Sequence, residues 1–227
     1  MEISAALKEK IALCPIFTYH SFKLVESGPM NYATTGEKFK LDIMQLMSNG
    51  YEPISLRDYY NYLNDENSPP KKHFVITMDD GYETNYDIAY PILKELNVPA
   101  SIFIVTDFVG LKKHPDHPNM TPHFNWNQAG EMEASGLVEI HSHGKWHLPN
   151  DSLDEILIEE TMRLSKEDIE AHLGKRDFIA YSYPNERFTP VTCEIANKTG
   201  YSLQMINYRE MSIFAIQNHI VEYVAAN

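Results

Sequence analysis

Two adjacent carboxylates, Asp79 and Asp80, follow an apolar run and are followed at once by Gly81. The run, residues 73–78, is rich in apolar and β-branched side chains, which predicts a buried strand. Neighbouring side chains of a strand point to opposite faces, so both carboxylates can reach one pocket only where the backbone turns, and glycine permits such a turn. Two carboxylates this close shift each other's pKa unless a cation or a proton intervenes. The alternative is an ordinary Asp-Gly turn.

A second group that could do chemistry is the pair His143 and His147, which also follows an apolar run. The spacing is that of helical zinc proteases, but the glutamate of their motif is missing, and Gly144 and Pro149 disfavour a helix. We therefore expect the pair at a strand end and in the loop after it. Two imidazoles and one carboxylate make a three-ligand site for Zn²⁺ or a similar divalent ion, with a position open for water. A surface or core pair is the alternative.

Length and composition limit the classes of protein. The 227 residues fit one α/β barrel domain, so a single domain is expected over 1–227. The net charge of -13 argues against nucleic acid as a partner and fits a neutral or cationic substrate. No window of about 18 uncharged apolar residues is present, so no membrane span is expected. Cys14 and Cys193 lie far apart and are expected to be free thiols.

The first 14 residues do not look like a secretory signal. They include charged residues and lack a continuous apolar core. As given, the chain is therefore expected to be cytoplasmic, unless a signal has been removed from it.

Strand patterns alternate with helix patterns along the chain. Strands are predicted at 15–20, 52–55, 73–78, 100–106, 138–143, 178–184, 201–206 and 213–217. Helices are predicted at 36–49, 56–63, 86–96, 126–135, 153–173 and 190–199, with Ser55 and Ser152 as N-caps. About seven or eight such units favour an α/β fold, a distorted (β/α)7-8 barrel, in which chemistry collects at the carboxyl ends of the strands. The residues His20, Asp79, Asp80, His143, His147 and Pro184 fall at those ends.

Residues 108–125 form a long polar segment that holds His114, His117 and His123. The three histidines sit among prolines and lysines at irregular spacing, which is typical of a solvated surface loop. We therefore do not include them in the predicted site.

The residues at the strand ends resemble the motifs of polysaccharide deacetylases of carbohydrate esterase family 4, the NodB-homology type. Residues 77–81 (T-M-D-D-G) are similar to the family's T-F-D-D-G motif, and residues 143–147 (H-G-K-W-H) to its H-(S/T)-x-x-H motif. Residues 183–185 (Y-P-N) lie where a tyrosine-proline segment follows the sixth strand. The resemblance covers 15–206 and is strongest to the branch that deacetylates poly-N-acetylglucosamine. The segments of this chain that resemble that branch are 19–20, 49–51, 90–93 and 99–103.

The resemblance implies a metal-dependent hydrolase that removes N-acetyl groups from an N-acetylated sugar polymer or oligomer. By position, Asp80, His143 and His147 would bind one divalent ion, Zn²⁺ first, with Co²⁺ or Ni²⁺ as alternatives. Asp79 would be the general base that takes a proton from the metal-bound water as the water attacks the acetamide. The oxyanion would rest on the metal and on a backbone N–H near Asn185.

Five residues are expected to contact the glycan substrate: His20, Trp146, Tyr183, Pro184 and Asn185. The rings of Trp146 and Tyr183 can stack on a sugar, although aromatic rings near barrel mouths usually pack inside the protein.

The chain departs from the family pattern at several positions. Ser182 stands where many members have an arginine, Glu186 and His141 stand where glycine is usual, and Gly144 replaces the hydroxyl residue of the histidine motif. The general acid, a histidine of the C-terminal segment in the family, has His219 as its only nearby candidate.

Two alternatives remain open at this stage. One is a small-molecule amidase or imidase on the same fold, which the lack of a signal favours. The other is a catalytically degraded carbohydrate-binding domain, which Gly144, Ser182 and the unplaced acid suggest. The joint presence of both aspartates and both histidines argues against the second. The oligomeric state is not predicted.

Overall fold

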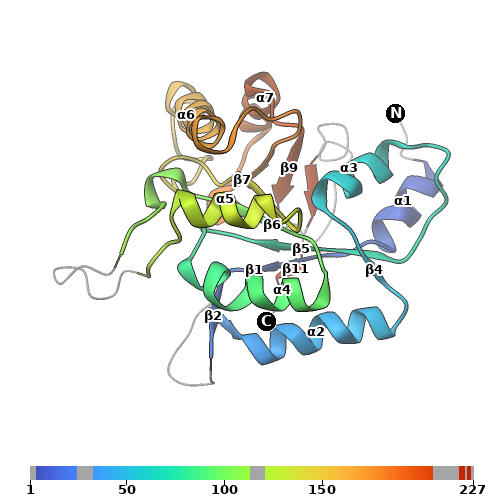
Figure 1. The fold of residues 1–227 in the computed structure, drawn as a ribbon. Helices are drawn as coiled ribbons and strands as arrows, with labels where there is room; N and C mark the ends of the chain where they lie inside the picture. The colour runs from blue at the N-terminus through green and yellow to red at the C-terminus, as the bar shows by residue number, and fades with distance from the viewer. Residues whose placement is uncertain (1–3, 25–32, 113–120, 207–219, 223, 226–227) are drawn as a thin grey trace.

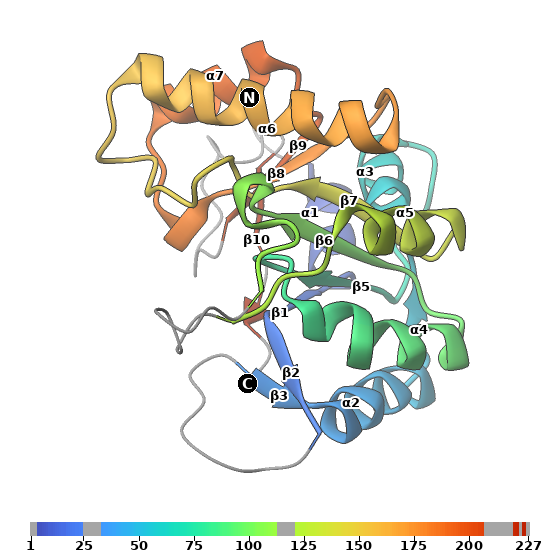
Figure 2. The same cartoon turned by 60° about the vertical axis from the view of Figure 1, so that its left-hand side comes forward.

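The fold is built on a parallel sheet that lies between layers of helices (Figures 1 and 2). The computed structural model describes residues 4–24, 33–112, 121–206, 220–222 and 224–225. The strands are β1 (Ile16–Tyr19), β4 (Glu52–Pro53), β5 (His73–Met78), β6 (Ala100–Ile104), β7 (Val138–Ser142), β8 (Ala180–Ser182), β9 (Leu203–Ile206), β10 (Ile220–Glu222) and β11 (Val224–Ala225). They run in the order β10-β9-β8-β7-β6-β5-β1-β11, with β4 beside β5, and every pair is parallel.

The two edges of the sheet are completed by one segment of the chain. β10 pairs with β9 at one edge, and β11, which follows almost at once, pairs with β1 at the other. A segment this short can reach both edges only if the sheet curls round until the edges approach each other. The predicted fold class, an α/β protein with a distorted barrel, is confirmed in this curled form.

Helices surround the curled sheet (Figures 1 and 2). They are α1 (Ala5–Ala12), α2 (Gly36–Ser48), α3 (Leu56–Asn64), α4 (Tyr90–Leu96), α5 (Trp126–Ala134), α6 (Glu155–Leu173) and α7 (Pro190–Thr199), with short helices η1 (Asn85–Ala89), η2 (Thr106–Phe108) and η3 (Pro184–Glu186). In both views α6 and α7 lie on one side of the sheet and α2 and α4 on the other (Figures 1 and 2). The predicted helices are all present. The predicted strand at 213–217 lies outside the described residues.

Several elements were not predicted, among them the strands β10 and β11 at the two edges of the sheet. Helix α1 begins after Ser4, whose side chain accepts a hydrogen bond from the N–H of Leu7. Two short parallel strands, β2 (Ser21–Lys23) and β3 (Ala33–Thr35), form a separate sheet. Strands of three residues carry too little alternation to be recognised in a sequence.

Alternation along β5 directs its side chains into two clusters. Phe74, Ile76 and Met78 belong to the larger cluster, which the outer helices contribute to. Val75 belongs to the smaller one. That inner cluster also contains Ile16, Phe103, Ala180, Leu203 and Met205, one or two from each of β1, β6, β8 and β9. Continuing the alternation places Thr77, and then Asp79, on the inner side of the sheet.

The structure also bears on the expectations for the two cysteines and for a membrane span. Cys14 and Cys193 are free, as predicted, and both are buried. Within the described part of the chain, no helix is both long and apolar enough to cross a bilayer.

The prediction that Ser152 caps α6 is wrong. The side chain of Asp154, not that of Ser152, accepts the hydrogen bond from Leu157 N–H at 2.9 Å, and the helix begins at Glu155. Ser152 instead donates to the carbonyl of Pro149 at 3.1 Å, within the turn that precedes the helix. Both residue types are good caps, so the choice depended on where the turn ended.

This correction can be tested with two substitutions in the same turn. Asp154→Ala removes the acceptor that caps α6 and should lower the free energy of unfolding by about 1 kcal/mol. Ser152→Ala removes only an exposed turn hydrogen bond and should change it by less than about 0.5 kcal/mol. Urea unfolding of both variants measures the difference, and equal losses would contradict the assignment.

Candidate metal and catalytic site

The predicted carboxylates and histidines meet at the carboxyl edge of the sheet. Asp79 and Asp80 follow β5, and His143 follows β7, with β6 between the two strands. The backbone N–H of Asp79 donates to the carbonyl of Tyr19 at 3.0 Å, so the ladder with β1 extends to this residue. Asp80 and Gly81 then both take positive φ values, 72° and 79°. The expected turn therefore lies directly after Asp79, and it changes the direction in which Asp80 projects.

Asp80, His143 and His147 form one compact cluster. Asp80 Oδ1 lies 3.2 Å from His147 Nε2 and 3.6 Å from His143 Nε2. One ligand atom from each residue can be chosen so that all three lie within 4.8 Å of one another. The sequence prediction grouped these three residues, and the structure brings them together.

The tautomer of His143 follows from its second nitrogen. His143 Nδ1 lies 2.9 Å from the carbonyl oxygen of Ser182. A carbonyl only accepts, so Nδ1 carries the proton and Nε2 turns its lone pair toward Asp80. A lone pair facing a carboxylate oxygen is favourable only with a cation or proton between them. A carbonyl behind the ring is also the usual partner of a metal-ligating histidine, so the donor set fits a divalent ion.

Burial and neighbouring charges hold the cluster in its ligand forms. Burial lowers the pKa of His143 to about 3, which keeps the imidazole neutral. Burial alone would raise the pKa of Asp80, but the hydrogen bond with His147 and the nearby imidazoles hold it well below its usual range. Tyr82 lies beside the same carboxylate. Burial, together with the charge of Asp80 and a hydrogen bond to it, raises the pKa of the Tyr82 hydroxyl.

Asp79 is the most buried acid of the site, with 2 % of its surface exposed. The hydroxyl of Ser182 donates to its Oδ2 at 3.3 Å. Burial first, and the charge of Asp80 second, raise the pKa of Asp79 well above its usual value. A carboxylate with a raised pKa is a stronger base than a solvated one, which suits proton abstraction.

The residues predicted to contact substrate divide into two groups. Burial lowers the pKa of His20, and the charges of Asp80 and Glu186 act against this shift, so His20 lies within electrostatic reach of the cluster. Asn185 is exposed and has φ 55°. Trp146 is half-buried between the two histidines of the motif.

Tyr183 and Pro184 are buried instead. The ring of Tyr183 is 1 % exposed and packs against Tyr181 and Phe188, with centroids 5.1 Å and 5.5 Å away, and its hydroxyl donates to Gln204 Oε1. In this arrangement the ring is covered by protein and is not available to stack on a sugar. What residues 183–185 offer a substrate is their backbone and the side chain of Asn185.

His123 corrects the prediction for the 108–125 segment. This residue is 6 % exposed, and its ring lies 5.0 Å from Tyr82 and 5.3 Å from Phe108. Its backbone forms a bridge with Tyr82, two residues after the metal-ligand candidate Asp80. It therefore forms part of a wall of the site, not of a solvated loop. The apolar neighbours Phe124 and Trp126 were the available signal. His114, His117 and His219 lie outside the described residues.

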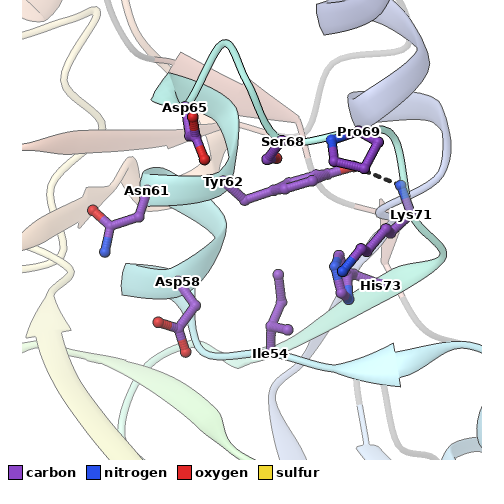
Figure 3. A pocket seen from close by; sticks show the side chains of 9 residues that line it. All are labelled: Ile54, Asp58, Asn61, Tyr62, Asp65, Ser68, Pro69, Lys71 and His73. Atoms are coloured by element: carbon purple, nitrogen blue, oxygen red, sulfur yellow. Dashed lines mark hydrogen bonds between the residues drawn. The ribbon is translucent and has the colours of Figure 1, made fainter.

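A separate cavity of about 330 Å³ lies at the other end of β5, where His73 begins the strand (Figure 3). Tyr62 lies across it, and its hydroxyl accepts a hydrogen bond from Lys71 N–H at 2.8 Å. The Lys10 ammonium donates to the carbonyls of Tyr62 and Asp65. These bonds tie the loop after α3 to the end of the sheet that in barrels serves stability.

Comparison with known proteins agrees with this geometry. The family model described as polysaccharide deacetylase matches residues 66–203. YxkH of Bacillus subtilis (strain 168), which carries the name of a polysaccharide deacetylase, is 32 % identical over 203 residues, 89 % of this chain and 67 % of that protein. The poly-beta-1,6-N-acetyl-D-glucosamine N-deacetylase of Staphylococcus aureus (strain MRSA252) is 29 % identical over 185 residues, 77 % of this chain and 62 % of that protein. The chain thus spans about two thirds of the length of these relatives.

Solved structures show the same fold. IcaB from Ammonifex degensii superposes with a TM-score of 0.80 at 25 % identity, covering 94 % of this chain and 91 % of that one. The Streptococcus pyogenes deacetylase PplD, in complex with acetate, also has a TM-score of 0.80, at 22 % identity, with 94 % and 92 % covered.

The curled parallel sheet is the fold of NodB-type deacetylases. The chain belongs to the polysaccharide deacetylase family, a family of hydrolases.

Gly81 allows the turn at the site to be tested by substitution. Its φ is 79°, and a Cβ there would lie 2.9 Å from Ile104 Cγ2. Gly136 is a matched control, because its φ is 76° and a Cβ would meet nothing within 4 Å. Gly136→Ala should lower the free energy of unfolding by about 1 kcal/mol, because a side chain is strained in the left-handed conformation. Gly81→Ala should lower it by a further amount of about 1 to 3 kcal/mol, because the added methyl group also overpacks against Ile104. Unfolding free energies of the two variants give the comparison, and equal losses would contradict it.

The buried carboxyl of Asp79 predicts how the metal-free protein responds to pH. Because its pKa is raised above its usual value of 3.8, the native state retains a proton that the unfolded chain releases. This group therefore costs stability as pH rises from 3.8 through the folded pKa. Asp79→Asn cannot ionise there. With a chelator present, this variant should be more stable than the wild type at neutral pH, and the difference should shrink in acid. Urea unfolding across pH measures it, and a less stable variant at neutral pH would contradict it.

Proposed function

We propose that this protein is a metal-dependent N-deacetylase that hydrolyses acetamide groups of an N-acetylated glucosamine polymer or oligomer. The observation that carries the proposal is the Asp80, His143 and His147 cluster beside the buried carboxylate of Asp79. The name of the Staphylococcus aureus relative supports the substrate class. We also propose that residues 1–227 act as one domain, because β1 and β11, from opposite ends of the chain, pair in one sheet.

Asp80, His143 and His147 would hold one divalent ion, Zn²⁺ before Co²⁺ or Ni²⁺, because two imidazoles and a carboxylate suit these ions. When bound, the ion would polarise the amide carbonyl and make water a better nucleophile. Asp80 therefore has to stay ionised and His143 neutral, which their pKa shifts favour.

Asp79 would act as the general base. It would take the proton of the attacking water at one carboxylate oxygen, while the Ser182 hydroxyl orients the carboxylate through Oδ2. Water adds to the carbonyl carbon, the C–N bond breaks, acetate leaves and the sugar amine gains a proton. His219, the one nearby candidate for the donor of that proton, lies outside the described residues.

The rim of the site would bind the sugar. His20 lies near the metal ligands, and Trp146 lies between them in sequence, so both would contact the acetylated residue. Residues 183–185 would contribute backbone, with the N–H of Asn185 facing the developing oxyanion. Asn185 and Glu186 both have positive φ, 55° and 59°, an unusual conformation that turns this backbone at the edge of the site.

The proposal is tested by acetate release. The protein is incubated with N-acetylglucosamine oligomers of β-1,4 and β-1,6 linkage and with simple N-acetyl amides, with and without a chelator. Release from the oligomers that stops with chelator and returns with Zn²⁺ or Co²⁺ is the expected result. Release from the simple amides alone would favour the amidase alternative. No release from any substrate by metal-loaded protein would refute an enzymatic role.

Asp79→Asn and His147→Ala separate the two roles. Loss of the base should lower turnover by about 10²- to 10⁴-fold without changing the metal content. Loss of a ligand should remove the metal as well. Elemental analysis and acetate release, measured on the same preparations, distinguish the two cases. Loss of metal in Asp79→Asn would overturn the division of roles.

A further inference from the structure

Lys145 lies between the two histidines of the motif in the sequence, and its ammonium group forms ion pairs with two carboxylates, those of Asp168 and Asp107. Its Nζ lies 2.7 Å from Asp168 Oδ2 and 3.0 Å from Asp107 Oδ1. The same Asp168 oxygen accepts from the hydroxyl of Thr106 at 2.8 Å. The Lys145 side chain is 20 % exposed, so its charge is substantially withdrawn from water and needs these partners.

Hydrogen bonds also hold the backbone of the loop between His143 and His147. The N–H of Lys145 donates to Thr161 Oγ1 at 2.9 Å. The carbonyls of Gly144 and Lys145 accept from the N–H groups of Thr106 and Asp107 at 3.2 Å and 3.1 Å. Bonds from both sides therefore determine the path of the loop between the two imidazoles.

Helix α6 presents a polar stripe to this loop. Thr161, Ser165 and Asp168 are four and three residues apart, which places them on one helical face. Thr161 and Ser165 are 1 % and 0 % exposed, at positions where a helix packed on a sheet normally carries apolar side chains. Ser165 Oγ lies 2.7 Å from Ser142 Oγ, which accepts from Gly144 N–H at 3.1 Å. Each member of the stripe thus bonds to the 142–145 segment.

The surroundings of Gly144 include a hydroxyl group from α6, that of Thr161. The φ of Gly144 is 82°, and a Cβ there would stand 3.1 Å from Tyr181 Oη and 3.3 Å from Thr161 Oγ1. The space beside residue 144 is therefore already occupied by two hydroxyls from elsewhere in the chain. Thr161 thus places a hydroxyl beside residue 144, the position at which the family motif carries a hydroxyl residue of its own.

We propose that Lys145, together with Asp168 and the α6 stripe, is a positioning device that sets the separation of His143 and His147 and hence the affinity of the site for its metal ion. The inference rests on the proposed metal site. His147 has a φ of 53°, a conformation that persists only where the surroundings over-determine it. Residues that orient metal ligands typically change metal affinity by about 10- to 100-fold when they are removed.

The test uses the full chain, stripped of metal and titrated with Zn²⁺ against a chromogenic chelator. Asp168→Asn and Lys145→Met should each weaken Zn²⁺ binding by about 10-fold or more. Lys145→Arg keeps a cation between the two carboxylates and should recover most of the affinity. Glu167→Gln is the matched control on α6, since it breaks only the half-exposed pair with Arg163 and should leave affinity within about twofold.

Co²⁺ absorption and thermal melting of the metal-free variants separate positioning from general stability. The expected result is an altered Co²⁺ spectrum in Lys145→Met at a melting temperature close to that of Lys145→Arg. If the wild type binds Zn²⁺ and Lys145→Met binds it equally well, the inference fails while the proposed function stands. Equal losses in Lys145→Arg and Lys145→Met would also overturn it. A wild-type chain that binds no metal would refute the proposed function and this inference together.

Discussion

The hydrogen bond from His143 Nδ1 to the carbonyl of Ser182 is the interaction on which the site depends. It joins β7 to β8 at the carboxyl edge of the sheet and leaves Nε2 as an acceptor that faces Asp80. With the opposite tautomer, Nε2 would donate to the carboxylate, and the pair would be a simple hydrogen bond with no place for a cation. Burial reinforces the arrangement by keeping the imidazole neutral, through a pKa lowered to about 3.

Backbone strain is concentrated around this interaction. Of the described non-glycine residues with positive φ, Asp80, His147, Asn185 and Glu186 belong to the site or its rim, and Asn97 ends α4. Left-handed conformations cost energy in L-residues and persist where the surroundings enforce them. Here the enforcement comes from the ladder that ends at Asp79 and from the bonds that hold Lys145. The stable sheet thus supports a set of turns that would not hold their conformations alone.

Ser182 and His141, which depart from the family pattern, each make defined contacts in the structure. Ser182, which stands where many members carry an arginine, bonds to Asp79 through its hydroxyl and to His143 through its carbonyl. His141, where glycine is usual, accepts from Ala180 N–H at Nδ1 and turns Nε2 toward Glu139 at 3.7 Å. It therefore belongs to packing below the site. None of these replacements removes a member of the Asp-His-His cluster, which argues against a degraded site.

The sequence by itself determined the main strands and helices of the fold, because alternation, helical periodicity and capping residues are local signals. It also determined which side chains lie together, since the ends of parallel strands meet at one edge and the aspartates and histidines directly follow such strands. Only the tertiary structure decided that Tyr183 is covered and that His123 is buried. It also decided that Thr161, Ser165 and Asp168 bond to the histidine loop. These outcomes depend on contacts between residues far apart in the chain, and no local pattern records which partner will fill a given space.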